Sequence, residues 1–269
     1  MKIRWLLLVI VVACAKSVFA FQDSTIHSHW KNQPMSIEDN SFIIEEAFNQ
    51  SPGVIQYTAS SQVANDGTAI NLECELPLSG ERHQLSFSLP TKVSSFTFAV
   101  EELMISYRPL VSGRHRWIMI TPRLSLIVPT ATIEPRLNGG TFGIEWNFAL
   151  TKRLSRNVIS HINLGSTHPL ARSHNEPQLN RLHDKFCGAS LVLALARNMD
   201  LLAEFKATNA SGHFASAGTW NLVANPGCRF LFKVTNFVIV PGLSAPIEWR
   251  TGLPVARQLL IYLSIERLR

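Results

Sequence analysis

The residue types that hydrolytic enzymes use occur together in the fragment 160–166, which reads SHINLGS. A histidine serves as general base for a serine only when the two side chains lie within hydrogen-bond reach. Successive side chains of a strand point to opposite faces, so His161 and Asn163 share one face and Ser160 lies on the other. We therefore predict that the chain is not an enzyme, and keep a lipid-modifying enzyme that uses His161 as an alternative.

Histidines gather in two polar stretches where they could bind a metal ion. His27 and His29 lie near the N-terminus, and three more follow at His168, His174 and His183. Neither stretch adds carboxylates or cysteines at the spacing of metal ligands. Nothing in the chain resembles a phosphate-binding loop or a nucleotide fingerprint. We expect solvated loop histidines, no metal site and no cofactor.

Charged side chains also stand in the middle of short apolar runs, and the run 141–150 shows the pattern best. Phe142, Ile144, Trp146, Phe148 and Leu150 alternate with polar or small residues. Such a period of two is typical of a strand with one apolar and one polar face. A carboxylate, that of Glu145, lies in the middle of the polar row.

The same alternation recurs in twelve runs after Gly53, with turn residues between them and no helical pattern. The runs cover residues 55–60, 70–76, 84–89, 102–108, 118–128, 141–150, 161–164, 188–195, 201–208, 220–232, 237–247 and 258–266.

The connections between the runs alternate in length. They are short after even-numbered runs, as at 79–81 and 197–198, and variable after odd-numbered runs, reaching about twenty residues between Thr167 and Lys185. An even number of strands, with tight turns on one rim and longer loops on the other, is typical of bacterial outer-membrane barrels. A soluble exported β-sandwich stays as an alternative.

The charges decide which face of these strands meets lipid. Burying so many of them in a small soluble core would be costly, and each Arg or Lys facing lipid would cost about 2 to 4 kcal/mol at the midplane. We therefore assign Phe142, Trp146 and Phe148 to lipid and the polar row to the lumen. The expected charged or polar lumen residues are Glu73, Glu75, Glu102, Arg123, Glu145, His161, Glu204, Lys206, Arg229 and Glu266.

The lumen row turns apolar on the last three strands, where Leu231, Val238, Val240 and Leu260 point inward. Two explanations stay open. The apolar sector could be a path for a hydrophobic or aromatic solute, with the charged wall orienting its polar end. It could also receive an N-terminal plug, because twelve strands enclose a lumen only somewhat wider than the eight-strand barrels that side chains fill.

The N-terminal part of the chain differs in kind from the runs. Residues 1–20 have the positive n-region, short apolar core and small-residue cleavage site of a secretory signal peptide. A lipoprotein signal stays open as an alternative, with Cys14 acylated. Residues 21–52 are expected to form a tail and a short amphipathic helix, capped by Ser36 and carrying Ile43, Ile44, Ala47 and Phe48 on one side.

Composition limits the partners of the exported chain. Without residues 1–20, 22 basic residues stand against 19 acidic ones, whereas a nucleic-acid binder shows a clustered basic footprint. Cys74, Cys187 and Cys228 lack C-x-x-C spacing, so at most one disulfide is expected. Three prolines, Pro122, Pro226 and Pro241, lie inside runs, and we expect paired bulges or bends at the last two.

Four groups of residues, taken together, resemble segments of a known protein family. They are 41–50 (SFIIEEAFNQ) with 52–54 (PGV), 82–86 (RHQLS), 121–126 (TPRLSL) and 239–247 (IVPGLSAPI). Over about residues 38–267 the chain resembles the bacterial outer-membrane barrel proteins labelled as the MetA-pathway of phenol degradation family. The resemblance implies an outer-membrane location and passage of small organic solutes. The chain departs from such barrels at its C-terminus, which lacks the aromatic residue that the assembly machinery reads.

The prediction is therefore an all-β fold, an antiparallel transmembrane β-barrel of about twelve strands with a short N-terminal helix or plug. The expected parts are a signal peptide at 1–20, a tail and helix at 21–52, and the barrel at 53–267. The expected function is a channel for small organic solutes in the bacterial outer membrane. Its expected partners are membrane lipid, the barrel assembly machinery and the solute, but no nucleic acid.

Overall fold

The structure is a computed structural model that describes residues 41–65, 67–78, 80–94, 98–112, 118–130, 142–170, 183–212 and 215–267. The expected signal peptide, Cys14, and the histidines at positions 27, 29 and 174 lie outside the described residues. The described residues include no helix that is long and apolar enough to cross a membrane.

The described chain forms sixteen strands. Their bounds are β1 Ile55–Ala64, β2 Gly67–Pro77, β3 His83–Val93, β4 Phe98–Val100, β5 Leu103–Pro109, β6 Met119–Val128, β7 Gly143–Arg153, β8 Val158–Pro169, β9 His183–Ala196, β10 Met199–Gly212, β11 Ala215–Phe230, β12 Phe232–Val234, β13 Phe237–Ser244, β14 Ile247–Arg250, β15 Ala256–Arg257 and β16 Leu259–Arg267.

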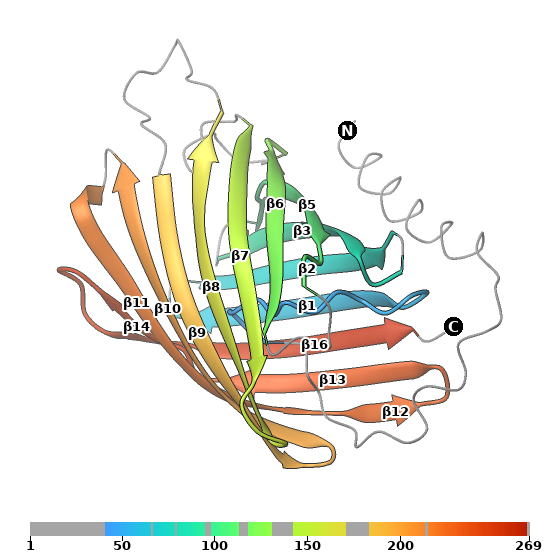
Figure 1. The fold of residues 1–269 in the computed structure, drawn as a ribbon. Helices are drawn as coiled ribbons and strands as arrows, with labels where there is room; N and C mark the ends of the chain where they lie inside the picture. The colour runs from blue at the N-terminus through green and yellow to red at the C-terminus, as the bar shows by residue number, and fades with distance from the viewer. Residues whose placement is uncertain are drawn as a thin grey trace. The chain divides into compact units, whose positions relative to one another are not determined.

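Twelve strands follow one another around a closed antiparallel barrel (Figure 1). The four short strands β4, β12, β14 and β15 continue β5, β11, β13 and β16, respectively, across local interruptions. The first and last strands close the wall, with Ile55 opposite Arg267 and Val63 opposite Leu259. The predicted twelve-strand barrel is confirmed, and a closed wall of this kind excludes the β-sandwich alternative.

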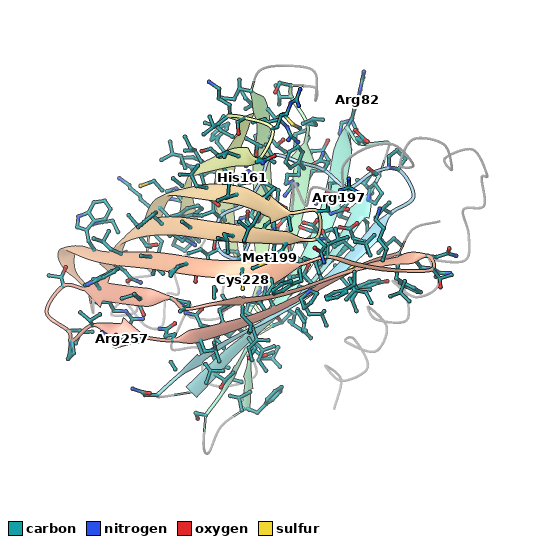
Figure 2. The ribbon with its side chains drawn as sticks, turned by 90° about the horizontal axis from the view of Figure 1, so that it is seen from below. Arg82, His161, Arg197, Met199, Cys228 and Arg257 are labelled. Carbon is teal, nitrogen blue, oxygen red and sulfur yellow. The ribbon has the colours of Figure 1, made fainter. Side chains whose placement is uncertain are left out.

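The apolar row faces outward and the polar row faces inward, as the charges predicted. On β7 the side chain of Phe148 is 47% exposed, whereas Asn147 beside it is 2% exposed. The same contrast separates Phe205, which is exposed, from Glu204, which is buried, on β10. Large apolar side chains are therefore exposed on the outer face of most described strands, and Figure 2 shows side chains projecting from the sheet.

The two rims of the barrel differ in their connections. One rim, here called the turn rim, includes the connections 78–82, 154–157 and 197–198. Arg82 belongs to the first of these connections and Arg197 to the last (Figure 2). The other, here called the loop rim, includes the long connections 129–142 and 170–182. The predicted segregation of turns and loops is therefore present, and β8 and β9 run a few residues further toward the loop rim than their alternation indicated.

No bulge occurs at Pro226 or Pro241, so that part of the expectation of bulges or bends is wrong. Pro226 pairs in register with Ala203 of β10, and Pro241 pairs in register with Leu263 of β16. In an antiparallel strand the N–H and C=O of one residue point to the same neighbour. The Pro226 carbonyl accepts from the Ala245 N–H at 2.9 Å, so Pro226 faces β13 and β14 rather than β10. The N–H that proline lacks is therefore missing only from the pairing of β11 with β13 and β14. This pairing is interrupted between β13 and β14 without a change of register.

The expected amphipathic helix is absent from its described part. Residues 41–54, here called the plug segment, have bends and a turn but no helix, and run through the interior of the barrel. Their N–H groups bond to side chains of the wall, as described below, so they are not available for helical i to i−4 bonds. Gly53, with φ of 78°, lies in the left-handed region that favours glycine and turns the chain into β1.

The cysteines of the barrel form no disulfide among the described residues. Cys74, Cys187 and Cys228 belong to β2, β9 and β11, none of which are neighbours in the wall.

Candidate functional site

A buried carboxylate of the wall holds the start of the plug segment. Glu204 of β10 is fully buried and accepts hydrogen bonds from three successive backbone N–H groups, those of Phe42 at 3.0 Å, Ile43 at 3.2 Å and Ile44 at 3.3 Å. The Asn225 Nδ2 group donates to the same carboxylate at 2.7 Å. An ionised carboxylate needs about this many donors when it leaves water. Glu204 therefore binds the main chain of the plug segment rather than its side chains.

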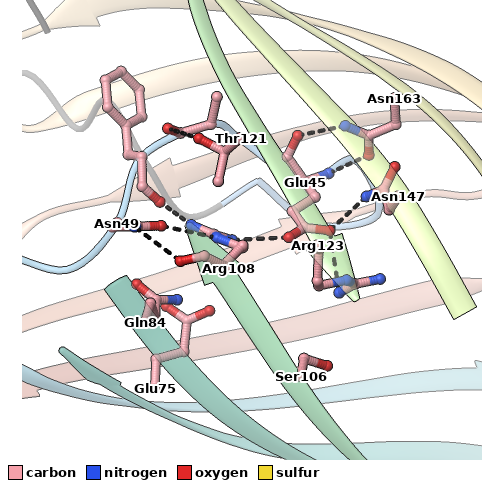
Figure 3. A network of polar contacts seen from close by, with 12 residues as sticks. Glu45, Asn49, Glu75, Gln84, Ser106, Arg108, Thr121, Arg123, Asn147 and Asn163 are labelled. Carbon is pink, nitrogen blue, oxygen red and sulfur yellow. Dashed lines mark hydrogen bonds and ion pairs between the residues drawn. The ribbon is translucent and has the colours of Figure 1, made fainter. Parts of the chain in front are cut away.

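A second carboxylate, that of Glu45 on the plug segment, forms the opposite arrangement with the wall (Figure 3). It pairs with Arg108 at 2.9 Å and Arg123 at 3.1 Å, and accepts from Asn147 Nδ2 at 2.5 Å. Burial tends to raise the pKa of Glu45, but attraction by Arg123 and Arg108 outweighs it, so this pKa lies below its ordinary value. Asn163 completes the site, since its amide bonds both the N–H and the C=O of Glu45 at 2.7 Å.

The remainder of the plug segment bonds the wall near the turn rim. Ala47 donates its N–H to Thr151 Oγ1 and accepts from Thr121 Oγ1, each at 2.8 Å. The Gln50 N–H donates to Gln84 Oε1 at 2.7 Å, and its side chain donates to Glu75 at 3.0 Å. Since Thr151 and Gln84 lie close to the turn-rim ends of β7 and β3, the plug segment descends from mid-barrel to that rim.

Three wall glycines make room for two apolar side chains of the plug segment. A Cβ atom at Gly227 or Gly242 would lie 2.6 or 2.5 Å from the Phe42 ring, and one at Gly188 would lie 2.3 Å from Cδ1 of Ile44. These distances are far below van der Waals contact. Phe42 also meets the Tyr262 ring edge-on at 5.2 Å between centroids. It packs on a buried apolar cluster of Ile159, Val192 and Leu202.

Above the plug segment, toward the loop rim, the barrel encloses a cavity of about 310 Å³. Its wall includes Thr167, Asp184 and Thr208, which lie near the loop-rim ends of β8, β9 and β10. Its floor includes residues 41–46 of the plug segment. Five of the predicted lumen residues line it: Glu73, Glu75, Arg123, Glu145 and Lys206.

The charges around the cavity are partly paired. Arg123 binds Glu145 at 2.5 Å in addition to Glu45, and Thr167 donates to Glu145 at 3.0 Å. The ammonium group of Lys206 lies 5.1 Å from the centre of the Phe186 ring, a distance at which a cation is attracted by the ring face.

Other predicted lumen residues lie inside the barrel but away from the cavity. Arg229 is fully buried and pairs with Asp200 at 3.2 Å. Val238 and Val240 form a buried cluster with Leu231, and Leu260 is 3% exposed. Glu102 is 8% exposed, and Glu266 pairs in register with Gln56 near the turn rim. Phe42 meets the last strands at Gly227, Gly242 and Tyr262, but it packs on the cluster of Ile159, Val192 and Leu202 rather than on that of Leu231, Val238 and Val240.

His161 is a structural residue in this geometry. It is fully buried on β8 (Figure 2), its Nδ1 atom lies 2.8 Å from Thr151 Oγ1, and its ring meets that of Phe48. Ser160 occupies the next position of the strand, on the opposite face. No group of three or more potential metal ligands occurs in the part of the chain that the structure describes.

Comparison with known proteins gives a fold but no family. No protein-family model and no curated protein sequence matches this chain, so the resemblance to the phenol meta-pathway family stays a prediction. The NanC porin superimposes with a TM-score of 0.58 at 8% identity, over 80% of this chain and 99% of that one. The KdgM porin gives 0.54 at 6% identity over 80% and 99%. The chain shares its fold with outer-membrane porins.

A third similar structure is an outer-membrane channel from Pseudomonas putida F1, with a TM-score of 0.52 at 14% identity, over 80% of this chain and 93% of that one. Identities this low relate the folds only. The contacts between plug segment and wall therefore have to be interpreted from this chain alone.

Sequence reasoning missed most of the residues that bind the plug segment. The sequence places Glu45 within the expected helix, and it places Arg108, Asn147 and Asn163 in polar rows of predicted strands but outside the expected set of lumen residues. The three wall glycines offer one usable indication in the sequence, because a glycine in a strand often marks the close approach of another group. They do not indicate that this group is the plug segment.

Proposed function

We propose that this chain is a channel of the bacterial outer membrane for small organic solutes. The observation that carries the proposal is a closed barrel whose outer face is apolar and whose interior is charged around a cavity. Only closed barrels and helices satisfy every backbone group in lipid, and a charged interior needs water or a polar solute. Porins with the same fold support this function.

In this proposal the plug segment is the gate. It lies across the lumen below the cavity and closes the route to the turn rim, which is the periplasmic side in barrels of this layout. Solutes enter from the loop rim, occupy the cavity, and pass when the plug segment leaves its contacts. The MetA-pathway resemblance, membrane lipid and the barrel assembly machinery remain expectations that accompany this proposal.

Liposome swelling tests the proposal with purified, reconstituted protein. We expect slow swelling in small sugars or amino acids for the native chain, and faster swelling when residues 21–50 are deleted. Absence of solute flux in both proteins, with the barrel shown to be folded, would overturn the channel.

A reversible lock tests the gate separately. Ile44→Cys with Gly188→Cys places two thiols close together, because Cδ1 of Ile44 now lies at the Cβ position of residue 188, and their oxidation requires the two Cβ atoms to reach about 3.8 Å. Cys74, Cys187 and Cys228 are replaced by serine in this experiment. Flux should be blocked when the pair is oxidised and restored by a reductant, and the serine background alone should respond to neither treatment. Equal flux in both redox states would contradict the gate.

A further inference from the structure

The cavity carries two charged side chains whose contacts leave their charge unpaired. Glu73 of β2 forms no hydrogen bond or ion pair among the described residues. Lys206 of β10 contacts the ring of Phe186 and forms no ion pair within the described chain, although Glu145 and Asp184 lie near enough to attract it. Both side chains line the cavity. The arginines beside them are already engaged, since Arg123 pairs with Glu45 and Glu145 and Arg108 pairs with Glu45.

These two charges stand on nearly opposite walls. In the closed order of twelve strands, β10 lies five strands from β2 in one direction and seven in the other. An anionic group and a cationic group therefore face each other across the cavity. Removing a charge from water without a partner is costly, so a solute that supplies both counter-charges is favoured over one that supplies only one.

The cavity also holds polar atoms without partners. Asn147, which is 2% exposed, has its Oδ1 atom buried and unbonded, and the Ser41 Oγ and Arg123 Nε atoms are buried without a partner among the described residues. All three residues line the cavity. They belong to a polar lining that suits a polar solute better than an apolar one. The volume of about 310 Å³ is at the small end of ligand sites.

We infer that the cavity binds small zwitterionic solutes of the amino-acid class, with the ammonium end at Glu73 and the carboxylate end at Lys206. This inference rests on the proposed function, because it names the solute of that channel. Glu75, next along the inner face of β2, strengthens attraction for the ammonium end. Phe186 keeps the Lys206 ammonium at the wall, where a carboxylate can reach it.

Calorimetric titration of the purified protein in detergent tests the site with probes of graded length. The zwitterions are glycine, 4-aminobutyrate and 6-aminohexanoate, and the single-charge controls are butylamine and butyrate. One zwitterion should bind at least tenfold more tightly than either control. Glu73→Gln should remove this preference and spare butyrate, and Lys206→Met should remove it and spare butylamine.

Matched variants and a second readout separate the possible outcomes. Glu101→Gln and Lys152→Met, which do not line the cavity, should bind as the native chain does, and boiling-dependent gel mobility verifies folding of every variant. Equal or tighter binding of a single-charge probe, or unchanged binding in both cavity variants, overturns the inference. Binding without flux in liposomes would refute the channel and keep the site, whereas flux without zwitterion binding would refute the site and keep the channel.

Discussion

At the scale of single residues, Glu45 is the side chain on which closure depends most. It forms ion pairs with two wall arginines, Arg108 and Arg123, and both arginines are largely shielded from solvent. Removing one partner of a buried ion pair costs about 3 kcal/mol. That corresponds to about a hundredfold change in the ratio of closed to open plug.

Glu45→Gln should therefore increase solute flux while leaving the barrel intact. Planar-bilayer conductance measures the effect, and the control is Glu101→Gln, which removes a carboxylate that pairs with Lys92 outside the plug segment. A closed, native-like conductance for Glu45→Gln would show that the two arginine pairs do not hold the gate.

Acid should act on the same contact. The pKa of Glu45 lies below its ordinary value because of Arg123 and Arg108, against the effect of burial. The lowered pKa means that the charged form stabilises the closed state at neutral and mildly acidic pH, and that this stabilisation is lost as pH falls through the lowered value, below the ordinary glutamate pKa of about 4.3. We expect conductance of the native chain to be constant from pH 7 to 5 and to rise below pH 4. The rise should be smaller in Glu45→Gln, whose contact is already broken.

At the scale of elements, the fit between plug segment and wall depends on strand glycines. Gly242→Val in β13 would place methyl groups inside the volume of the Phe42 ring, whose nearest atom lies 2.5 Å from the Cβ position. We expect faster liposome swelling with unchanged barrel stability, because the valine suits a strand. In a Phe42→Ala background the same substitution should add little, and additive effects in this double-mutant cycle would contradict the direct contact.

The two faces of β7 give the second prediction at this scale. Phe148→Lys places a charge on the apolar outer face, at a cost of about 2 to 4 kcal/mol near the middle of a bilayer, and should reduce the fraction of folded barrel recovered from membranes. Asn147→Lys places the charge inside, where it disrupts the bond to Glu45, and should mainly change permeation. Heat-modifiable gel mobility and conductance separate the two effects, and the reverse pattern would overturn the assignment of faces.

The strands could be predicted from the sequence, and the plug segment could not. Alternation in runs such as 141–150 has one physical cause, the opposite directions of successive side chains, so it gives both the strands and their faces. No pattern within residues 41–50 determines their conformation. Ile43, Ile44, Ala47 and Phe48 match a helical period, but the N–H groups are taken by Glu204, Asn163 and Thr151, which come from distant parts of the chain.

At the scale of the whole molecule, the closed wall predicts high resistance to unfolding. Every one of the twelve strands has two neighbours, and the seam between β1 and β16 is formed by nine residue pairs. A sample kept below boiling should therefore migrate faster on a detergent gel than a boiled one. Identical migration would contradict a closed barrel in the purified protein.

The contact between Glu204 and three consecutive N–H groups has a consequence for how related chains can diverge. A carboxylate that binds main chain accepts any residue at position 43 except proline, which lacks the donor. Positions 42 and 44 are different, because a larger side chain there requires glycine opposite it at 188, 227 or 242. Natural relatives should therefore vary freely at 43, while large residues at 42 and 44 and glycines in the wall are gained and lost together.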